Sequence, residues 1–289
     1  MAGAYAGRPP QERPRASKAA GKPPRAPKPR VRIEDAGGAR TLVVDETFAS
    51  FYRPGELATG CVWDAIAAPL LWLPPRRRRK VLILGLGGGS VARLARAIAP
   101  EAEIVGVELD AEVVRLARAQ LDLDRLGLRV ELADARAWLA SAVHRGERFD
   151  AILEDVFMGR GDAVHKPDWI PDPAHRQATA LLTRGGLLVS NTLDEHARVA
   201  VGMRASFASV VEIQVVDYDN RVLVGGPEGL LGTALRQAVA ASPILRESLP
   251  ILAFRTRSGR VQPEARLPPR AASVSRRSAP RRENAARPD

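Results

Sequence analysis

The stretch Lys80–Ser90, KVLILGLGGGS, constrains the fold of this chain more than any other. Val81–Leu84 is a short continuous apolar run, the pattern of a strand buried on both faces. Gly85, Gly87 and Gly89 follow at alternate positions, and apolar residues at helical spacing come next. Glycines permit positive φ and close backbone approach, and a helix N-terminus presents unpaired N–H groups to an oxygen-rich ligand. A strand, a glycine turn and a helix in this order therefore predict a nucleotide-binding site.

Apolar runs and helical patterns alternate along most of the chain, which predicts a sheet built largely from parallel strands. Strands are expected at 81–84, 103–108, 128–132, 149–154 and 187–191, and helices at 90–99, 110–120, 134–142, 173–183 and 194–207. The last two apolar runs, 210–217 and 221–226, are separated by only three residues. Such a gap joins antiparallel strands, because a parallel crossover needs about a dozen residues or more. The pattern therefore predicts an α/β fold of the Rossmann-like class I methyltransferase type, a mostly parallel sheet that ends in an antiparallel hairpin.

A small β-element precedes this sheet. Residues 31–35 and 40–45 have the pattern of two strands joined by a Gly-containing turn, and 48–52 can add a third extended piece. A helical pattern then runs from Thr59 to Pro74, where two prolines end it. We therefore expect four regions: a basic Pro-rich tail over 1–30, a β-hairpin plus helix over 31–75, a Rossmann-like ligand-binding domain over 76–254 and an Arg-rich tail over 255–289.

The basic charge of the chain lies in its two tails. The net charge is +11; residues 1–30 carry eight Lys or Arg against one acid, and residues 255–289 carry ten Arg against three acids. The remaining residues are therefore mildly acidic, which does not favour a nucleic-acid-binding core. Both tails are rich in Pro, Ala, Arg and Ser and poor in large apolar residues, so we expect them to be disordered. Weak, salt-sensitive contact of the tails with a polyanion stays open as the alternative.

The cysteine, histidine and hydropathy patterns exclude several kinds of site and segment. Cys61 is the one cysteine, which excludes an internal disulfide and a cysteine-based metal cluster, and the four histidines lack metal-ligand spacing. We therefore predict no metal. No apolar run approaches the roughly 20 residues that span a bilayer, and the N-terminal segment has no hydrophobic signal core. The expectation is a cytoplasmic protein without membrane contact.

Acidic residues follow the second and third expected strands, at the edge where ligands bind in open α/β sheets. Glu108 comes 19 positions after Gly89, a spacing at which a carboxylate can accept hydrogen bonds from both ribose hydroxyls of NAD or of an adenosyl sulfonium. A capping role for the next helix fits Asp110 better. Asp134, followed by Ala135, can hold the adenine amino group or simply cap the helix that it precedes, and both roles stay open.

The fourth strand ends in two adjacent acids, Glu154 and Asp155. Side chains alternate faces along a strand, so we expect one acid to face the ligand and the other to make a structural contact. Asp155, at the tip, is the better candidate to abstract or orient a proton or to hold a substrate amine. The alternative is that Asp155 only begins the following loop and has no catalytic role. The long segment 156–172 that follows is expected to be a lid or a substrate-facing surface; its His165 is more simply a solvated side chain.

Over about residues 31–230 these motifs resemble those of the spermidine synthase-like branch of the class I S-adenosylmethionine-dependent transferases. KVLILGLGGGS is similar to VLIIGGGDGG of that branch, VELDAEVVRLAR to its VEID motif, and ADARAWL to its adenine motif. FDAILEDVF puts Asp155 where YDVIIVDSSDP has its catalytic aspartate. The resemblance implies a catalytic Asp155, a small-molecule acceptor, a homodimer as a candidate assembly, and S-adenosylmethionine or its decarboxylated form held by Gly85, Gly87, Gly89, Glu108, Asp134 and Ala135.

The chain departs from the branch at three positions. The acid inside the glycine turn, implied to hold the amine of the decarboxylated donor, is replaced by Gly88, and the second acid of DSSDP by Met158. The glutamine after the hairpin corresponds to Ala49. A polyamine is a polycation that acids must hold, so these replacements favour methyl transfer over aminopropyl transfer.

Three hypotheses follow. The first is methyl transfer from S-adenosylmethionine to a small acceptor, with Asp155 removing a proton. The second is aminopropyl transfer to a diamine, with Asp155 accepting hydrogen bonds from the attacking amine. The third is a non-catalytic nucleoside-binding protein. A NAD dehydrogenase fits least, because Ser90 replaces the third glycine of GxGxxG.

Overall fold

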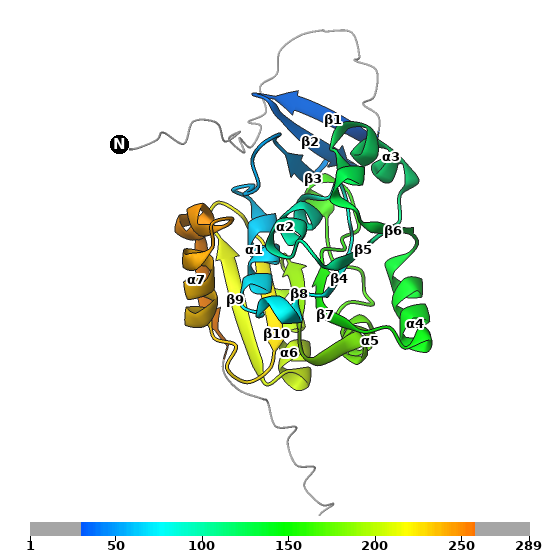
Figure 1. Cartoon of the computed structure of the whole chain (residues 1–289). Coiled ribbons are helices and arrows are strands. Elements are labelled where there is room, and N and C mark those ends of the chain that lie inside the picture. Colours follow the sequence, from blue (N-terminus) through cyan, green and yellow to red (C-terminus); the bar gives the residue numbers. More distant parts are fainter. Residues whose placement is uncertain (1–29, 258–289) are drawn as a thin grey trace, which may run out of the picture.

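The computed structural model describes residues 30–257; the segments 1–29 and 258–289, which hold most of the two expected tails, lie outside the described part. Figure 1 shows a large twisted sheet with helices on both sides and a small sheet above one of its ends. The small sheet has the order β1-β2-β3, with bounds Val31–Ala36, Ala39–Val44 and Thr47–Tyr52. The expected N-terminal β-element is therefore confirmed, with its third strand.

The large sheet has the strand order β11-β9-β10-β8-β7-β4-β5-β6. Its strands are β4 (Lys80–Leu84), β5 (Glu103–Glu108), β6 (Arg129–Leu132), β7 (Phe149–Glu154), β8 (Leu182–Thr192), β9 (Ser209–Val215), β10 (Arg221–Gly226) and β11 (Leu252–Thr256). The five strands from β8 to β6 pair in parallel, whereas β10 pairs antiparallel with both β8 and β9. The Rossmann-like class I methyltransferase fold predicted from the strand pattern is thus confirmed.

Helices cover both faces of the large sheet, because its central strands are apolar on both sides. Val81 and Ile83 of β4 belong to one core, with α1, α2, α3 and α7, while Leu82 and Leu84 belong to the other, with α4, α5 and α6. The helices are α1 (Val62–Ala67), α2 (Ser90–Ile98), α3 (Ala111–Gln120), α4 (Ala135–Arg145), α5 (Ala174–Leu181), α6 (His196–Ser206) and α7 (Gly232–Ala241). This two-sided burial explains the continuous apolar runs seen in the sequence.

The structure differs from the expected elements at two places. The helix expected from Thr59 is α-helical only over α1 and continues as a 3₁₀ turn over Ala68–Leu71, with Pro69 at its start. Beyond the hairpin, α7 and β11 were not predicted, and β11 adds an antiparallel edge strand to β9. The boundary expected between residues 254 and 255 falls inside β11, since Arg255 and Thr256 pair with Glu212 and Val211.

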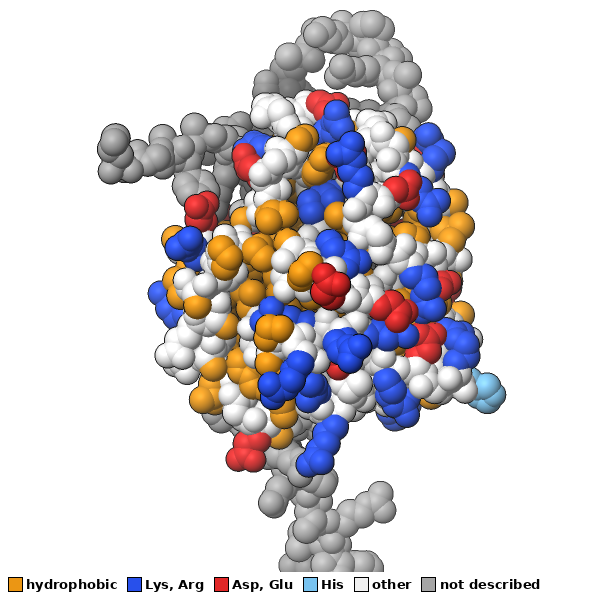
Figure 2. All heavy atoms as spheres, in the orientation of Figure 1, with side chains coloured by type: hydrophobic (Ala, Val, Ile, Leu, Met, Phe, Trp, Pro, Cys, Tyr) orange, Lys and Arg blue, Asp and Glu red, His pale blue; other side chains and the backbone are white. Residues whose placement is uncertain are grey.

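Charges of both signs are mixed on the surface of the described part. Figure 2 shows Lys and Arg side chains interspersed with Asp and Glu on the visible face, while hydrophobic side chains gather toward the side of α7. Within residues 30–257, no helix is long and apolar enough to cross a membrane. The same residues contain no group of three or more His, Cys, Asp or Glu side chains arranged to hold a metal ion.

Candidate active site

The glycine turn after β4 lies directly against the tip of β7. Gly85 and Leu86 both donate their N–H groups to the carbonyl oxygen of Val107, at 3.0 Å each. Gly85 has φ +79°, and a Cβ on it would lie 2.5 Å from the carbonyl oxygen of Asp155. Glycine is therefore required here on two counts, backbone conformation and space. The turn brings the ends of β4, β5 and β7 to one place.

We expect Gly85→Ala to lower the free energy of unfolding by at least about 2 kcal/mol, because the new Cβ meets backbone and the residue keeps a left-handed φ. Gly127→Ala is the matched control. Gly127 has φ +58°, but a Cβ added to it would meet no atom within 4 Å, so this variant loses only the conformational part, about 1 kcal/mol. Urea unfolding of both variants measures the difference. Equal losses would contradict the close approach of Gly85 to Asp155.

Glu108 ends β5 with its carboxylate turned back onto the glycine turn. Its Oε2 accepts the N–H of Gly87 at 2.8 Å, and its Oε1 accepts the N–H groups of Leu109 and Asp110 at 3.0 and 3.1 Å. Partial burial raises the pKa of this carboxyl above its ordinary value, although these three bonds favour the charged form. Asp110 accepts the N–H of Glu112 and caps α3, the role expected for it. Glu108 is thus a fixed acceptor beside the glycines.

Asp134 and Ala135 begin α4 next to Glu108. The N–H of Ala133 donates to the carbonyl oxygen of Glu108 at 2.9 Å, which joins the ends of β5 and β6. The Asp134 side chain is exposed, and its Oδ1 accepts the N–H of Ala137 at 2.9 Å, so it caps the helix. Ala135 is buried at the first position of α4. The structure therefore shows the capping role of Asp134, and this cap uses one of its two carboxylate oxygens.

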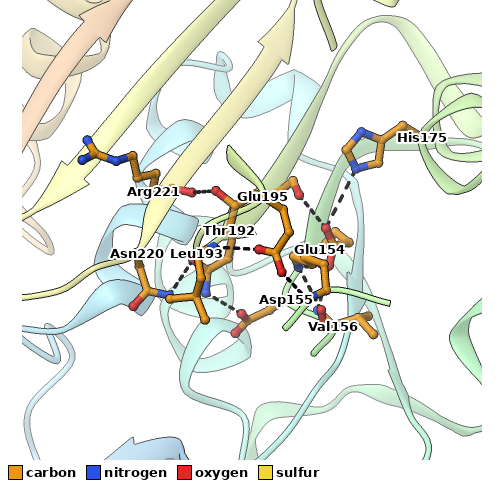
Figure 3. A network of polar contacts seen from close by, with 12 residues as sticks. Glu154, Asp155, Val156, His175, Thr192, Leu193, Glu195, Asn220 and Arg221 are labelled. Atoms are coloured by element: carbon orange, nitrogen blue, oxygen red, sulfur yellow. Dashed lines mark hydrogen bonds and ion pairs between the residues drawn. The ribbon is translucent and has the colours of Figure 1, made fainter. Parts of the chain in front are cut away.

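Asp155 lies between the glycine turn, β8 and α1. Its N–H donates to the carbonyl oxygen of Leu84 at 2.9 Å, and its Oδ1 accepts a hydrogen bond from Asn191 Nδ2 at 2.7 Å. Asn191 is held in turn by Asn220 from the β9–β10 turn, at 3.0 Å (Figure 3). Burial raises the pKa of the Asp155 carboxyl to about 6, against the opposing effects of Asn191 and nearby charge. A carboxyl with this pKa can accept a proton near neutral pH.

Glu154 points to the other side of β7 and is 1% exposed. Lys166 Nζ donates to its Oε1 at 2.5 Å, and Ser190 Oγ donates to its Oε2 at 2.5 Å. The N–H of Val156 also donates to Oε1, at 2.7 Å. Although burial raises it, the pKa of the Glu154 carboxyl falls to about 2 because of Lys166 and its other partners. The two adjacent acids thus have the two different environments that the sequence predicted.

Sequence reasoning missed Lys166, Asn191 and Ser50. Lys166 lies in a segment without periodicity, and nothing in the sequence distinguishes it from a solvated lysine. Asn191 ends the buried run of β8, so its place at the carboxyl edge of the sheet was a usable signal. His165, by contrast, is exposed and its Nδ1 lies 2.9 Å from the carbonyl oxygen of Ala163, the solvated position expected for it.

Strand β3 packs on the glycine turn and fills the place of the missing acid. Ser50 Oγ accepts the N–H of Gly88 at 2.7 Å, and Ser90 Oγ bonds both the N–H and the carbonyl of Phe51 at 2.9 Å. A Cβ on Gly88 would lie 2.5 Å from Leu121 Cδ1 and 2.7 Å from Ser50 Cβ. An aspartate at residue 88 therefore does not fit this packing.

Segment 156–172 closes one side of the same region. Met158 and His165 form an antiparallel bridge, and the N–H of Gly161 donates to the carbonyl oxygen of Asp45 at 3.0 Å. Asp45 also pairs with Arg30, which contacts Asp110 beside Glu108. The segment, the β2–β3 turn and the start of α3 are therefore linked around the strand ends.

Comparisons with known proteins find partial sequence relatives and solved structures of similar fold. No family model matches the sequence. A polyamine aminopropyltransferase from Vibrio vulnificus is 33% identical over 131 residues, which are 43% of this chain and 40% of that protein. A probable spermidine synthase from Corynebacterium glutamicum has a similar structure, with a TM-score of 0.61 and 21% identity over 78% of this chain and 86% of that one. The structure of human methyltransferase-like protein 13 in complex with SAH is also similar, with a TM-score of 0.53 and 22% identity. The match covers 66% of this chain and 93% of that one.

The matching part is only a portion of the relatives. The matched segments span 40%, 21% and 56% of the length of three polyamine aminopropyltransferase relatives, less than two thirds in each case. The similar solved structures, at 21% and 22% identity, establish the shared fold.

Proposed function

We propose that this chain, a spermidine synthase-like protein of the class I methyltransferase fold, transfers an aminopropyl group from decarboxylated S-adenosylmethionine to an amine acceptor. The observation that carries the proposal is Asp155, held by Asn191 at the strand tip beside the glycine turn, with a pKa of about 6. The names of the relatives favour this reaction over the methyl transfer that the sequence departures favoured.

The proposed chemistry is a single displacement. The acceptor amine attacks the aminopropyl carbon bound to the sulfonium, so that a C–N bond forms while the C–S bond breaks and methylthioadenosine leaves. The attacking nitrogen must lose one proton, and the Asp155 carboxylate accepts it before it passes to water. The protein otherwise aligns donor and acceptor, because the sulfonium is already a good leaving group.

The donor is proposed to lie across the ends of β4, β5 and β6. Gly85, Gly87 and Gly89, all with positive φ, form the turn that runs beside it, and Glu108 accepts hydrogen bonds from the ribose hydroxyls. Asp134 and Ala135 meet the adenine ring. Glu108 supports this role because its three backbone hydrogen bonds fix the carboxylate without enclosing it completely.

Methyl transfer from S-adenosylmethionine is the second candidate. The packing of Ser50 and Leu121 over Gly88 favours it, because it leaves no room for an acid that could hold the donor's free amine. Met158, where the spermidine synthase-like branch has a second acid, is exposed. The first observation removes negative charge that would hold the donor's amine, and the second removes negative charge that would hold a polycationic acceptor.

Calorimetry with the two donors separates the candidates. Under the proposal, decarboxylated S-adenosylmethionine binds at least tenfold more tightly than S-adenosylmethionine. The reverse order supports methyl transfer. If neither nucleoside binds, the chain lacks the proposed donor site and the proposal is wrong.

Glu108→Gln should weaken donor binding about 10–100-fold, because charge-assisted hydrogen bonds to the ribose contribute roughly 1.5–3 kcal/mol. The substitution keeps the shape of the side chain and an oxygen that can accept the Gly87 N–H, but its NH2 group cannot accept the N–H groups of Leu109 and Asp110, so urea unfolding of the variant is measured alongside the affinity. Asp110→Asn is the matched control, because Asn preserves the cap of α3 and residue 110 has no proposed ligand contact. Calorimetric titration of both variants measures the effect. Equal affinities in Glu108→Gln and wild type would exclude Glu108 from the donor site.

A further inference from the structure

A buried lysine touches the chain on both sides of Asp155. The Lys166 side chain has no exposed surface, and its Nζ donates to Glu154 Oε1 and to the carbonyl oxygen of Val156, the latter at 2.9 Å. The same atom lies 4.1 Å from the centre of the Phe157 ring. Residues 154 and 156 are the immediate neighbours of Asp155 in the chain. One ammonium group therefore binds the residue before Asp155 and the residue after it.

We propose that Lys166 is a second positioning residue for Asp155: Asn191 holds the carboxylate directly, and the Lys166 ammonium fixes the backbone of residues 154–156 from which the carboxylate points. This inference rests on the function proposed above for Asp155. It assigns Lys166 no contact with donor or acceptor.

The lysine is itself anchored to a rigid support. Its backbone N–H donates to Glu195 Oε1 at 2.8 Å, and Glu195 Oε2 accepts the N–H of Leu193 at 3.3 Å, at the start of α6. Lys166 thus links Glu195, just before α6, to Glu154 at the end of β7; both acids are labelled in Figure 3. Because the Lys166 backbone is fixed by Glu195, its ammonium holds Glu154 and the Val156 carbonyl in one geometry.

Asp155 needs such a support because β7 ends at Glu154. Past that point the backbone leaves the ladder, and its remaining ties are the N–H of Asp155 to Leu84 and the N–H of Val156 to Glu154. The carbonyl of Val156 would otherwise be free to rotate. Burying an ammonium group here costs more free energy than burying an apolar side chain of similar size would. A role in fixing the geometry of residues 154–156 therefore explains the buried lysine better than anchoring of the loop alone.

The test uses the neutral pair Lys166→Met/Glu154→Gln in the full chain. Removing both charges avoids an unpaired buried ion, and Gln retains an acceptor for the Val156 N–H and a donor for Ser190. Lys80→Met is the control, because Lys80 pairs with Glu103 and Glu147 at the opposite end of the sheet. The probes are decarboxylated S-adenosylmethionine and 1,4-diaminobutane.

We expect the neutral pair to melt close to wild type and to keep its KM for the donor within about twofold, while kcat falls about 10–100-fold, the penalty of a misdirected catalytic group. A merely structural lysine would change the melting temperature and leave kcat unchanged. Wild-type kcat in the neutral pair would overturn the inference, provided that Asp155→Asn is inactive. If Asp155→Asn is as active as wild type, the proposed function fails instead.

A second readout needs no substrate. The charged groups around Asp155 are Glu154 and Lys166, with His175 and Glu195 packed against them. Carbon-13 NMR follows the signal of the Asp155 carboxyl carbon. This signal is assigned as the one that is missing from the spectrum of Asp155→Asn. In the neutral pair we expect its signal to move, because the direction of the carboxyl changes; the loss of Lys166 raises the pKa of Asp155 and the loss of Glu154 lowers it, so the titration midpoint should change little. An unchanged signal would overturn the inference even if no transfer activity were found.

Discussion

The Asp155→Asn variant should transfer the donor group about 10²–10⁴ times more slowly than wild type, the usual contribution of a general base, while binding the donor with similar affinity. Asn is nearly isosteric and can still accept the hydrogen bond from Asn191, but it cannot take a proton from the attacking amine. Single-turnover kinetics with bound donor measures the rate, and calorimetry measures the affinity. A rate within threefold of wild type would exclude Asp155 as the base.

The same side chain predicts the pH dependence of transfer. With a pKa of about 6, Asp155 is protonated and inactive as a base at pH 5 and is ionised at pH 7. Transfer by wild type should therefore rise between pH 5 and pH 7, and the small residual activity of Asp155→Asn should lack this rise. A profile that is flat over this range would mean that another group accepts the proton.

Asp155→Asn should also stabilise the fold, because the ionised carboxyl is less favourable in the site than in the unfolded chain. The pKa is raised, so the contribution of Asp155 to stability is fully present below its ordinary pKa and is lost as pH rises through about 6. At pH 7.5 the variant should therefore gain about 1–3 kcal/mol, and at pH 4 the gain should be close to zero. Urea unfolding at both pH values tests the sign. A loss of stability at pH 7.5 would contradict the burial of this carboxylate.

Lys166→Met alone should lower the free energy of unfolding by about 3–5 kcal/mol, the largest stability effect that we expect. It leaves the Glu154 carboxylate buried with Ser190, the Val156 N–H and His175, whose Nε2 lies 3.9 Å from Oε2, but without the lysine ammonium. Adding Glu154→Gln to it should recover most of the loss. Lys80→Met, at a half-exposed pair, should change stability by less than about 1 kcal/mol. Equal losses in the single and double variants would show that packing, not the charge pair, dominates.

Acid unfolding tests the same pair by a different route. The pKa of Glu154 is lowered to about 2, so its contribution to stability is present above the ordinary value near 4.5 and is lost as pH falls from there toward 2. Wild type should therefore lose more stability between pH 4.5 and pH 2.5 than the double variant does. Urea midpoints across this range give the comparison. Parallel curves would mean that Glu154 does not titrate as the pair predicts.

The sheet could be predicted from the sequence because its central strands must be apolar on both faces. The runs at β4, β5 and β7 leave no alternative to a buried parallel sheet, and the short gap before β10 permits only a hairpin. The glycine turn, Glu108, Asp134 and Asp155 follow from the same logic, since each lies at or just past a strand end at one edge.

The remaining features depend on contacts between distant segments, which no local pattern encodes. Lys166 is twelve residues from Glu154, and only the path of the intervening loop makes it a buried ion. Ser50 reaches Gly88 from another sheet. β11 is a short strand, LAFRT, too short to be recognised alone, and it is held as an edge strand by pairing with β9 and by Arg257, whose guanidinium binds the buried Glu212. These features were accordingly missed.

Mass spectrometry of the nucleoside product tests the central claim most directly. The chain is incubated with 1,4-diaminobutane and either decarboxylated S-adenosylmethionine or S-adenosylmethionine, with Asp155→Asn in parallel. Aminopropyl transfer predicts methylthioadenosine and an aminopropylated amine from the decarboxylated donor alone, with both products strongly reduced in the variant. Formation of S-adenosylhomocysteine from S-adenosylmethionine, with no methylthioadenosine from the decarboxylated donor, would contradict it.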